Sequence, residues 1–406
     1  MGPFNQRTLP KISPLLDQVV RQLAARDYPL PMPRLFEAVQ ELSLRFTRER
    51  QSLPSEYLDD PRFAAAYLSY FLPVNVSKVQ VLLDELPLET DLAGQTDGTY
   101  SVLDLGSGPG TAGLAVLDWM VQRKGKDAKV SVVSVDRSQR TVADSVSLWD
   151  SYCREAGVTR ATLKSHVGDL ESIRRGAVGN VIREGSPYDV VIIANCLNEL
   201  FGDSADPISR RTELVESLFP LLQSHGSLMI IEPALRQISR ELHQVRDHLL
   251  QSKICTVYSP CLHERACPAL VHPDDWCHEE RPWQPPAAIQ VIDREVGFIK
   301  DALKFSYLLL RTDGRTIVER QPNVYRVVSE LREFKGEKRA WLCNEQGRSE
   351  VGRLDRLASP QNAAVDNWHR GAIVQIEKIV RKERDGKVSA LGRIERDAVV
   401  ELIRLA

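Results

Sequence analysis

The sequence predicts an α/β protein built around a largely parallel sheet, in a chain of 406 residues. Three observations lead to this prediction. Apolar runs of strand length alternate with helical segments from Tyr100 to about Leu250, which is typical of βαβ units. A glycine-rich turn, Gly106 to Gly110, directly follows the first apolar run. The second run ends on an acidic residue, Asp136. At this length we expect two or three domains.

Residues 1–95 are predicted to form a helical region. Apolar residues recur at helical spacing from Leu15 to Leu23 and again from Leu35 to Phe46. A third periodic stretch runs from Val79 to Leu86, before a polar linker between Gly94 and Gly98. We therefore place the first domain boundary after residue 95.

Residues 96–323 are predicted to form a Rossmann-like domain with five parallel strands. These strands are Ser101–Leu105, Val130–Val135, Ala161–Val167, Val190–Ala194 and Ser227–Ile231. Phe305–Leu310 resembles a later strand, and we expect the sheet to close with an antiparallel pair.

The glycine-rich turn favours a nucleoside ligand. Gly106, Gly108 and Gly110 let the backbone turn sharply and approach a ligand where a Cβ would collide. The spacing is D-x-G-x-G-x-G, which suits S-adenosylmethionine better than the G-x-G-x-x-G pattern of dinucleotide sites. Asp104 would meet the positively charged methionine end, and Asp136 would hold two ribose hydroxyls.

Two further strand ends add candidates at the same edge of the sheet, where open α/β sheets bind ligands. Asp169 follows the third strand and would accept from an adenine amino group, and Asn195 follows the fourth strand. The predicted cofactor-binding set is Asp104, Gly106, Ser107, Gly108, Gly110, Asp136, Asp169 and Asn195.

A cysteine-rich segment, residues 255–286, interrupts the α/β pattern. Such a long irregular stretch needs something to hold it. It contributes Cys261, Cys267 and Cys277, and Cys343 follows much later in the chain. Four thiolates suit either a cubane iron–sulfur cluster or a structural zinc ion. His263, His272 and His278 are alternative ligands, whereas Cys153, Cys196 and Cys255 are expected to be ordinary buried thiols.

Residues 324–406 are predicted to form a small, β-rich, barrel-like appendage that contributes Cys343. The expected strands are Arg339–Asn344, Glu350–Leu354, Ile373–Val380 and Val388–Ile394. The stretch from His369 to Arg396 carries eight Lys or Arg against four acidic residues. It is either a face that follows a phosphate backbone or an ordinary solvated surface.

The bulk composition narrows the class of protein. The net charge of −2 excludes a globally basic nucleic-acid binder. No apolar run is long enough to span a bilayer, and the N-terminus lacks the apolar core of a secretory signal. Seven cysteines without an export signal indicate a reducing compartment. We therefore expect a cytoplasmic monomer without a membrane partner.

With both features in view, the chain resembles the methyltransferase-like proteins of the small ribosomal subunit, found in mitochondria and many bacteria. Matching segments are Tyr67 to Asn75, Leu103 to Gly110, Asn195 to Leu200, Pro260 and Cys261 through to Asp275–His278, and Leu342 with Cys343. The cysteine segment makes the match specific. The resemblance implies a Rossmann-like class I methyltransferase domain and a 4Fe–4S cluster, rather than zinc, on Cys261, Cys267, Cys277 and Cys343. It also implies a role on small-subunit ribosomal RNA and places the protein on the ribosome.

The catalytic signature is incomplete. Enzymes that methylate exocyclic nitrogens usually carry Asn/Asp-Pro-Pro-aromatic after the fourth strand, but here Asn195 is followed by Cys196, Leu197 and Asn198. Cys196 lacks the neighbouring proline of a carbon-5 cytosine nucleophile. Asn195, Cys196 and Glu199 are therefore weak catalytic candidates. A ribosomal RNA methyltransferase, a non-catalytic assembly factor and a small-molecule methyltransferase remain open.

Overall fold

The computed structural model describes residues 12–49, 56–87, 98–173, 177–299, 301–384 and 386–405. The first eleven residues and the boundary expected after residue 95 lie outside these ranges. The chain divides into two compact units. The first contains Met1–Pro207, Ser217–Ile231 and Pro282–Leu303, and the second contains Ile208–Glu216, Glu232–Arg281 and Lys304–Ala406. The division into three regions that the sequence predicts remains a prediction.

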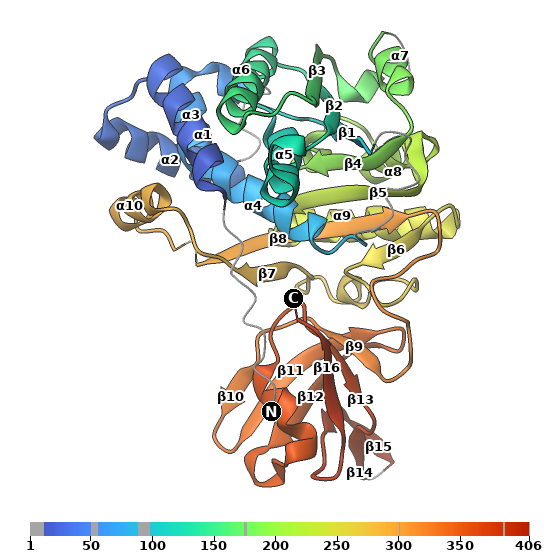
Figure 1. The fold of residues 1–406 in the computed structure, drawn as a ribbon. Coiled ribbons are helices and arrows are strands. Elements are labelled where there is room, and N and C mark those ends of the chain that lie inside the picture. The colour runs from blue at the N-terminus through green and yellow to red at the C-terminus, as the bar shows by residue number, and fades with distance from the viewer. Residues whose placement is uncertain are drawn as a thin grey trace. The chain divides into compact units, whose positions relative to one another are not determined.

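The first unit contains the five predicted parallel strands, which the structure confirms (Figure 1). They are β1 (Tyr100–Leu105), β2 (Val130–Asp136), β3 (Ala161–Val167), β4 (Tyr188–Ala194) and β5 (Leu222–Pro233). Their order is β3-β2-β1-β4-β5, with all four pairings parallel. The strand order reverses beside β1, so β1 and β4 end at the switch point where Rossmann-like sheets bind ligands.

Helices connect these strands. They are α5 (Thr111–Lys124), α6 (Gln139–Ala156) and α7 (Ala177–Glu184), and α10 (Ala287–Val296) joins the same unit. Short turns of helix add η5 (Gly125–Asp127), η6 (Leu170–Ser172), η7 (Leu197–Glu199) and η8 (Phe219–Leu221). Ser138 begins α6 by accepting from the Thr141 N–H, and Gly157 ends it in the left-handed conformation.

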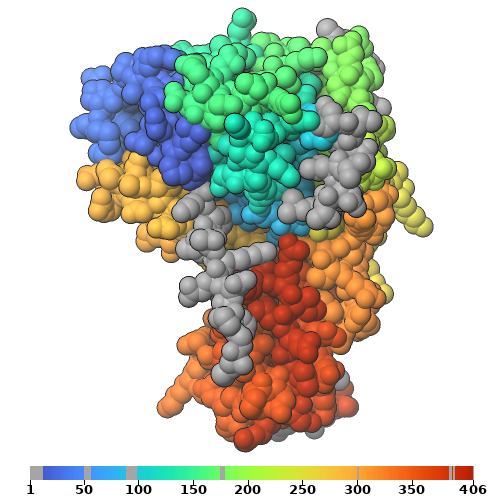
Figure 2. All heavy atoms as spheres, in the orientation of Figure 1, coloured from blue at the N-terminus to red at the C-terminus, as the bar shows by residue number. Residues whose placement is uncertain are grey.

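The predicted N-terminal helical region is present where the structure describes it. Its elements are α1 (Pro14–Asp27), α2 (Met32–Thr47), η2 (Tyr57–Asp59), α3 (Pro61–Ala66), the π-helical turn η3 (Tyr67–Phe71) and α4 (Leu72–Leu83). Figure 2 shows the blue atoms of this region packed directly against the green atoms of α6. Tyr28 donates to Asp144 at 2.6 Å, and Ser138 donates to Asp59 at 2.8 Å. These contacts hold η2 and α1 against the helix that follows β2.

The second unit contains the cysteine-rich segment. Its elements are α8 (Pro207–Glu216), α9 (Arg236–Gln251), β6 (Thr256–Ser259), η9 (Pro268–Leu270), β7 (Glu279–Pro282) and β8 (Ala302–Arg311). The predicted antiparallel pair is β6 with β8. The segment expected to be irregular contains two short strands, one near each end. The sequence analysis did not predict them, because polar and proline residues obscure the alternation that marks a strand.

A second sheet occupies the C-terminal part of this unit. Its strands are β9 (Val324–Val327), β10 (Arg332–Phe334), β11 (Glu337–Asn344), β12 (Gly347–Leu354), β13 (Ile373–Ile376), β14 (Val380–Arg384), β15 (Lys387–Arg393) and β16 (Val400–Arg404). The order is β14-β15-β12-β11-β9-β13-β16, with β10 on β11. Between β12 and β13 lie η10 (Asp355–Leu357) and η11 (Pro360–Asn367). The predicted strand Ile373–Val380 is divided between two strands with different partners, because β13 pairs with β9 and β16 whereas β14 pairs with β15.

Candidate cofactor site and cysteine-lined cavity

The glycine turn after β1 has the conformation that its sequence predicts. Gly106, Gly108 and Gly110 have φ of 70°, 52° and 80°, which glycine adopts without steric cost. A Cβ on Gly106 would lie 2.3 Å from the Cys196 sulfur, and one on Gly110 would lie 2.4 Å from the Ser145 hydroxyl. A Cβ on Gly108 would have no protein atom within 4 Å. Two glycines therefore allow close packing, while the third faces open space.

Asp136 lies at the end of β2 and is fastened to this turn. Its Oδ2 accepts from the Gly108 N–H at 2.8 Å. Its Oδ1 accepts from the Ser138 N–H at 3.0 Å and from the Thr141 hydroxyl at 2.9 Å. Since Oδ2 accepts one of these bonds, it keeps a lone pair for a ligand hydroxyl. This arrangement is compatible with the predicted ribose contact.

Asp104 lies deeper than the sequence analysis assumed. It is 1% exposed, and its Oδ2 accepts from the Gly113 N–H in the first turn of α5 at 2.9 Å. Burial raises the pKa of Asp104 to about 7, opposed by the Gly113 N–H and supported by the charge of Asp136. A ligand cation beside this carboxyl would favour its ionised form.

The remaining strand-end candidates differ in their surroundings. Asp169 is exposed and caps η6 by accepting from the Glu171 N–H at 3.0 Å. Asn195 has a positive φ of 56°, and its N–H donates to Ile231 at 2.7 Å. Cys196 and Glu199 are half-buried, and Glu199 lies 3.6 Å from Arg137. The structure thus places Cys196 against Gly106 and brings Asn195 and Glu199 to the same edge of the sheet.

Two tyrosines that the cofactor prediction did not include face this edge. Burial raises the pKa of Tyr57 well above its usual value, and the charges of Tyr67, Glu199 and Asp136 act in the same direction. Tyr67 lies 3.5 Å from the Thr111 hydroxyl, at the start of α5. The sequence could have identified Tyr67, because this residue belongs to one of the segments that carried the family resemblance. Tyr57 lies in none of those segments.

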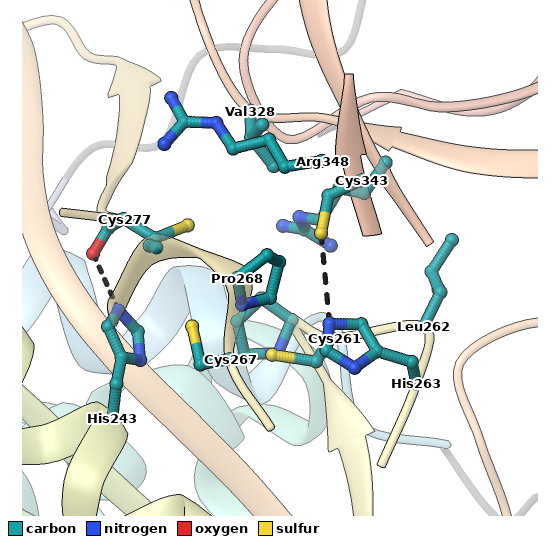
Figure 3. A pocket seen from close by; sticks show the side chains of 13 residues that line it. His243, Cys261, Leu262, His263, Cys267, Pro268, Cys277, Val328, Cys343 and Arg348 are labelled. Atoms are coloured by element: carbon teal, nitrogen blue, oxygen red, sulfur yellow. Dashed lines mark hydrogen bonds between the residues drawn. The ribbon is translucent and has the colours of Figure 1, made fainter. Parts of the chain in front are cut away.

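The four predicted metal-binding cysteines line one cavity in the second unit (Figure 3). Cys261, Cys267 and Cys277 come from the cysteine-rich segment, and Cys343 comes from β11. The cavity encloses about 440 Å³ including its open mouth. Cys267 is buried and the other three thiols are half-buried. Of the cysteines expected to be ordinary buried thiols, Cys255 is buried, whereas Cys153 and Cys196 are half-buried.

Basic side chains from α9 hold the segment that carries three of these thiols. The Arg240 guanidinium donates to the carbonyls of Ala269, Leu270, His272 and Asp275 at 2.6 to 3.2 Å. Arg246 is fully buried, forms an ion pair with Asp247 and donates to the His263 carbonyl at 2.6 Å. Asp247 in turn accepts from the Cys267 N–H at 2.9 Å. The loop is therefore built around charges that α9 contributes.

The predicted alternative histidine ligands are not equivalent. His263 lies with Nε2 3.7 Å from the Cys343 sulfur. His272 is exposed, and His278 stacks on Trp276 and contacts Glu280. His243, which the sequence analysis did not single out, also lines the cavity and donates from Nε2 to the Cys277 carbonyl at 3.0 Å. His243 lies on helix α9, outside the cysteine-rich segment, and its sequence neighbours give no metal-binding signal. Sequence reasoning therefore missed it.

The donor atoms suit a thiolate-bound metal centre. Burial and the neighbouring Cys261 raise the pKa of Cys277 to about 11, and burial also raises the pKa values of Cys267 and Cys343. The thiols would therefore release protons on binding a metal. Within the described ranges, no three His, Cys, Asp or Glu side chains are grouped so as to hold a metal ion. The four cysteines nevertheless line one shared cavity.

The strand order and the glycine turn define a Rossmann-like α/β protein of the methyltransferase type, here combined with a cysteine-lined cavity. More particularly, the chain belongs to the family described as mitochondrial small ribosomal subunit Rsm22, whose model matches residues 62–353. That match includes the glycine turn and all four cavity cysteines.

The solved structures with partial similarity to this chain include several methyltransferases. The mitomycin 7-O-methyltransferase MmcR is 13% identical, with a TM-score of 0.34, and the alignment covers 73% of this chain and 72% of that chain. A Listeria monocytogenes protein described as a class I S-adenosylmethionine-dependent methyltransferase is 14% identical, with a TM-score of 0.38 and coverage of 76% and 90%. The plantazolicin methyltransferase BpumL, solved with SAH, is 11% identical, with a TM-score of 0.32 and coverage of 73% and 99%. No curated protein matches this chain. In the part of the chain that the structure describes, no helix is both long and apolar enough to cross a membrane.

Proposed function

We propose that this protein binds S-adenosylmethionine at the glycine turn and a 4Fe–4S cluster at Cys261, Cys267, Cys277 and Cys343. It acts on the small ribosomal subunit, by methylating its RNA, by assisting its assembly, or both. The protein is a cytoplasmic, ribosome-associated monomer. The observation that carries the proposal is the pairing of an Rsm22 family match with four cysteines around one cavity.

The cluster is preferred to zinc because the family resemblance implies it, since four thiolates by themselves suit either centre. The four cysteines line one cavity, although among the described residues no group of three or more His, Cys, Asp or Glu side chains is placed to hold a metal ion. The cluster would tie β11 to the cysteine-rich segment.

The cofactor assignment is supported by the open space at Gly108, the Asp136 carboxylate beside it and the buried acid Asp104. Together they offer a close backbone approach, an acceptor for ribose hydroxyls and a negative group for the cationic end of the ligand. Asp169 and Asn195 complete the proposed set at neighbouring strand ends.

Anaerobic purification with iron, sulfide and zinc analysis tests the cluster directly. We expect about four irons and four sulfides per chain and a broad absorption band near 400 nm. One zinc per chain without colour would replace the cluster with a structural zinc site. The ribosomal role would then depend on the family match alone.

A non-catalytic assembly factor is the second candidate, favoured by the sequence Asn195-Cys196-Leu197-Asn198 at the end of β4, which lacks the prolines and aromatic residue of amino-methylating enzymes. Co-sedimentation with small subunits at increasing salt tests binding, since phosphate contacts weaken as salt rises. Transfer of a labelled methyl group to small-subunit RNA, absent in an Asp136→Ala variant, would establish the enzyme. Salt-dependent binding without transfer would establish the assembly factor.

A further inference from the structure

Three polar side chains of the N-terminal helical region form a chain that ends beside the glycine turn. The Lys78 ammonium donates to Asn75 Oδ1 at 3.0 Å. Asn75 Nδ2 donates to the Tyr67 hydroxyl oxygen at 3.4 Å. That hydroxyl lies 3.5 Å from the Thr111 hydroxyl, immediately after Gly110. All four residues belong to the first unit.

The burial of these residues indicates an opening at Asn75. Every residue of α4 is buried except Asn75, which is half-buried. Lys78 is only 9% exposed, an unusual position for an ammonium group. Tyr67 is half-buried as well. Asn75 is therefore the least buried residue of α4, and its side chain is contacted by a buried cation.

The donor and acceptor properties of these groups fix the direction of the hydrogen bonds between Lys78, Asn75 and Tyr67. An ammonium can only donate, so the Asn75 oxygen must face Lys78 and its NH₂ must face Tyr67. Since Asn75 donates to the Tyr67 oxygen, the Tyr67 proton points away from Asn75. The distance to Thr111 is at the limit for an O–H···O bond, so that contact is weak. Burial raises the pKa of Tyr67, which keeps the hydroxyl protonated.

We propose that Tyr67 and Asn75, polarised by Lys78, bind the carboxylate at the amino-acid end of the cofactor. This inference rests on the proposed binding of S-adenosylmethionine. A chain of donors that begins at a cation ends most favourably on an anionic acceptor. The cofactor has one carboxylate, while Asp136 and Asp104 already offer partners for its hydroxyls and its cationic groups.

The local backbone is consistent with a binding role. Residues Tyr67–Phe71 form a π-helical turn between α3 and α4. Such turns are rare and occur frequently at functional sites. This turn begins at Tyr67, the last member of the chain of donors, so an irregular backbone coincides with the proposed contact.

Two ligands distinguish binding of the cofactor's amino-acid end from binding of its nucleoside end. S-Adenosylhomocysteine carries the carboxylate, whereas 5′-methylthioadenosine lacks the whole amino-acid end. We would measure both affinities by calorimetry for the wild type, Tyr67→Phe and Asn75→Ala. Each variant should bind S-adenosylhomocysteine roughly ten-fold more weakly, the usual effect of losing a hydrogen bond to a charged group. Binding of 5′-methylthioadenosine should be unchanged.

Tyr70→Phe is the matched control, because Tyr70 lies in the same π-helical turn but its hydroxyl is buried against Asp293. It should leave both affinities unchanged, which shows that disturbing the turn is not itself the cause. Asp136→Asn should weaken both ligands. Equal weakening of both ligands in Tyr67→Phe and Asn75→Ala would overturn this inference alone. Failure of the wild type to bind either ligand would overturn the proposed cofactor, and this inference with it.

Discussion

Asp104 is the residue whose protonation most directly affects the candidate cofactor site. Its carboxyl is buried below the glycine turn and has a pKa of about 7 because of that burial. The folded chain therefore retains a proton that the unfolded chain loses near pH 4, so this residue's contribution to stability declines as the pH rises from about 4 to about 7. A cationic ligand reverses the preference, because it interacts favourably only with the ionised carboxyl.

We expect cofactor affinity to rise with pH and to level off above about pH 7, since the ligand selects the ionised form of Asp104. Below pH 7 the affinity should fall by up to about ten-fold for each pH unit. Titrations with S-adenosylmethionine from pH 5.5 to 8.5 measure this, and Asp104→Asn should bind weakly with no such slope. An equal slope in both proteins would assign the pH dependence to another group.

The three glycines of the turn should respond differently to an added methyl group. Gly106→Ala places a Cβ against the Cys196 sulfur at a positive φ, so the variant should lose both stability and binding. Gly108→Ala meets no protein atom and should cost only about 1 kcal/mol of folding free energy, from its positive φ. Its binding of the cofactor should nevertheless be lost. Thermal unfolding and calorimetry distinguish the two, and a Gly108→Ala protein with full affinity would move the ligand away from this turn.

At the scale of elements, the parallel strands were predictable and several functional elements were not. Strands β1, β2 and β4 and the second half of β5 are largely buried apolar runs, and such runs need no tertiary information to be recognised. Strand β3, at the edge of the sheet, is more exposed and is recognised by its place in the alternation of strands and helices. The π-helical turn at Tyr67 packs against α1 and α10, and η2, which carries Tyr57, packs against α6. Local sequence spacing does not report such tertiary contacts. Strands β6 and β7 are four residues each and carry mixed polar residues, so their pairing is set by partners distant in sequence.

Arg240 links helix α9 to the cysteine-rich segment through four carbonyl groups. Arg240→Ala should lower the free energy of unfolding by on the order of 2 kcal/mol, because several carbonyls lose a charged donor together. Urea unfolding measures the loss, and limited proteolysis should detect new cleavage between residues 260 and 278. Arg236 lies on the same helix as Arg240 and forms an exposed ion pair with Asp274 of the cysteine-rich segment. Arg236→Ala removes this pair and should change the free energy of unfolding by less than about 0.5 kcal/mol. Similar effects of the two substitutions would show that the carbonyl contacts are unimportant.

At the scale of the whole chain, the cavity joins cysteines that are far apart in sequence. Three lie within one segment, and the fourth arrives on β11 after β8, β9 and β10. The sequence analysis identified the set by its residue types and by family resemblance. It could not locate His243 or Arg246, because these residues reach the segment from helix α9 through tertiary packing.

Cys343→Ser should lose most of its bound iron and unfold at a lower temperature, because the proposed cluster would lose its only ligand from β11. The same result is expected for Cys261→Ser, Cys267→Ser and Cys277→Ser. Cys255→Ser is the control, since this buried thiol does not line the cavity. Iron analysis and thermal unfolding after anaerobic purification provide the readout. A Cys277→Ser protein with full iron and unchanged stability would remove Cys277 from the ligand set.

The two units interleave along the chain, and this has a consequence for how the protein is made. The first unit needs residues up to Leu303, and the second unit claims residues from Ile208 onward. Neither unit is complete when the other begins, so a nascent chain of 406 residues cannot finish one before starting the next. Truncation at any single position between 208 and 303 removes part of both. During translation the early α/β strands of the first unit must therefore wait for their last segment, Pro282–Leu303, which is made only after the second unit has begun.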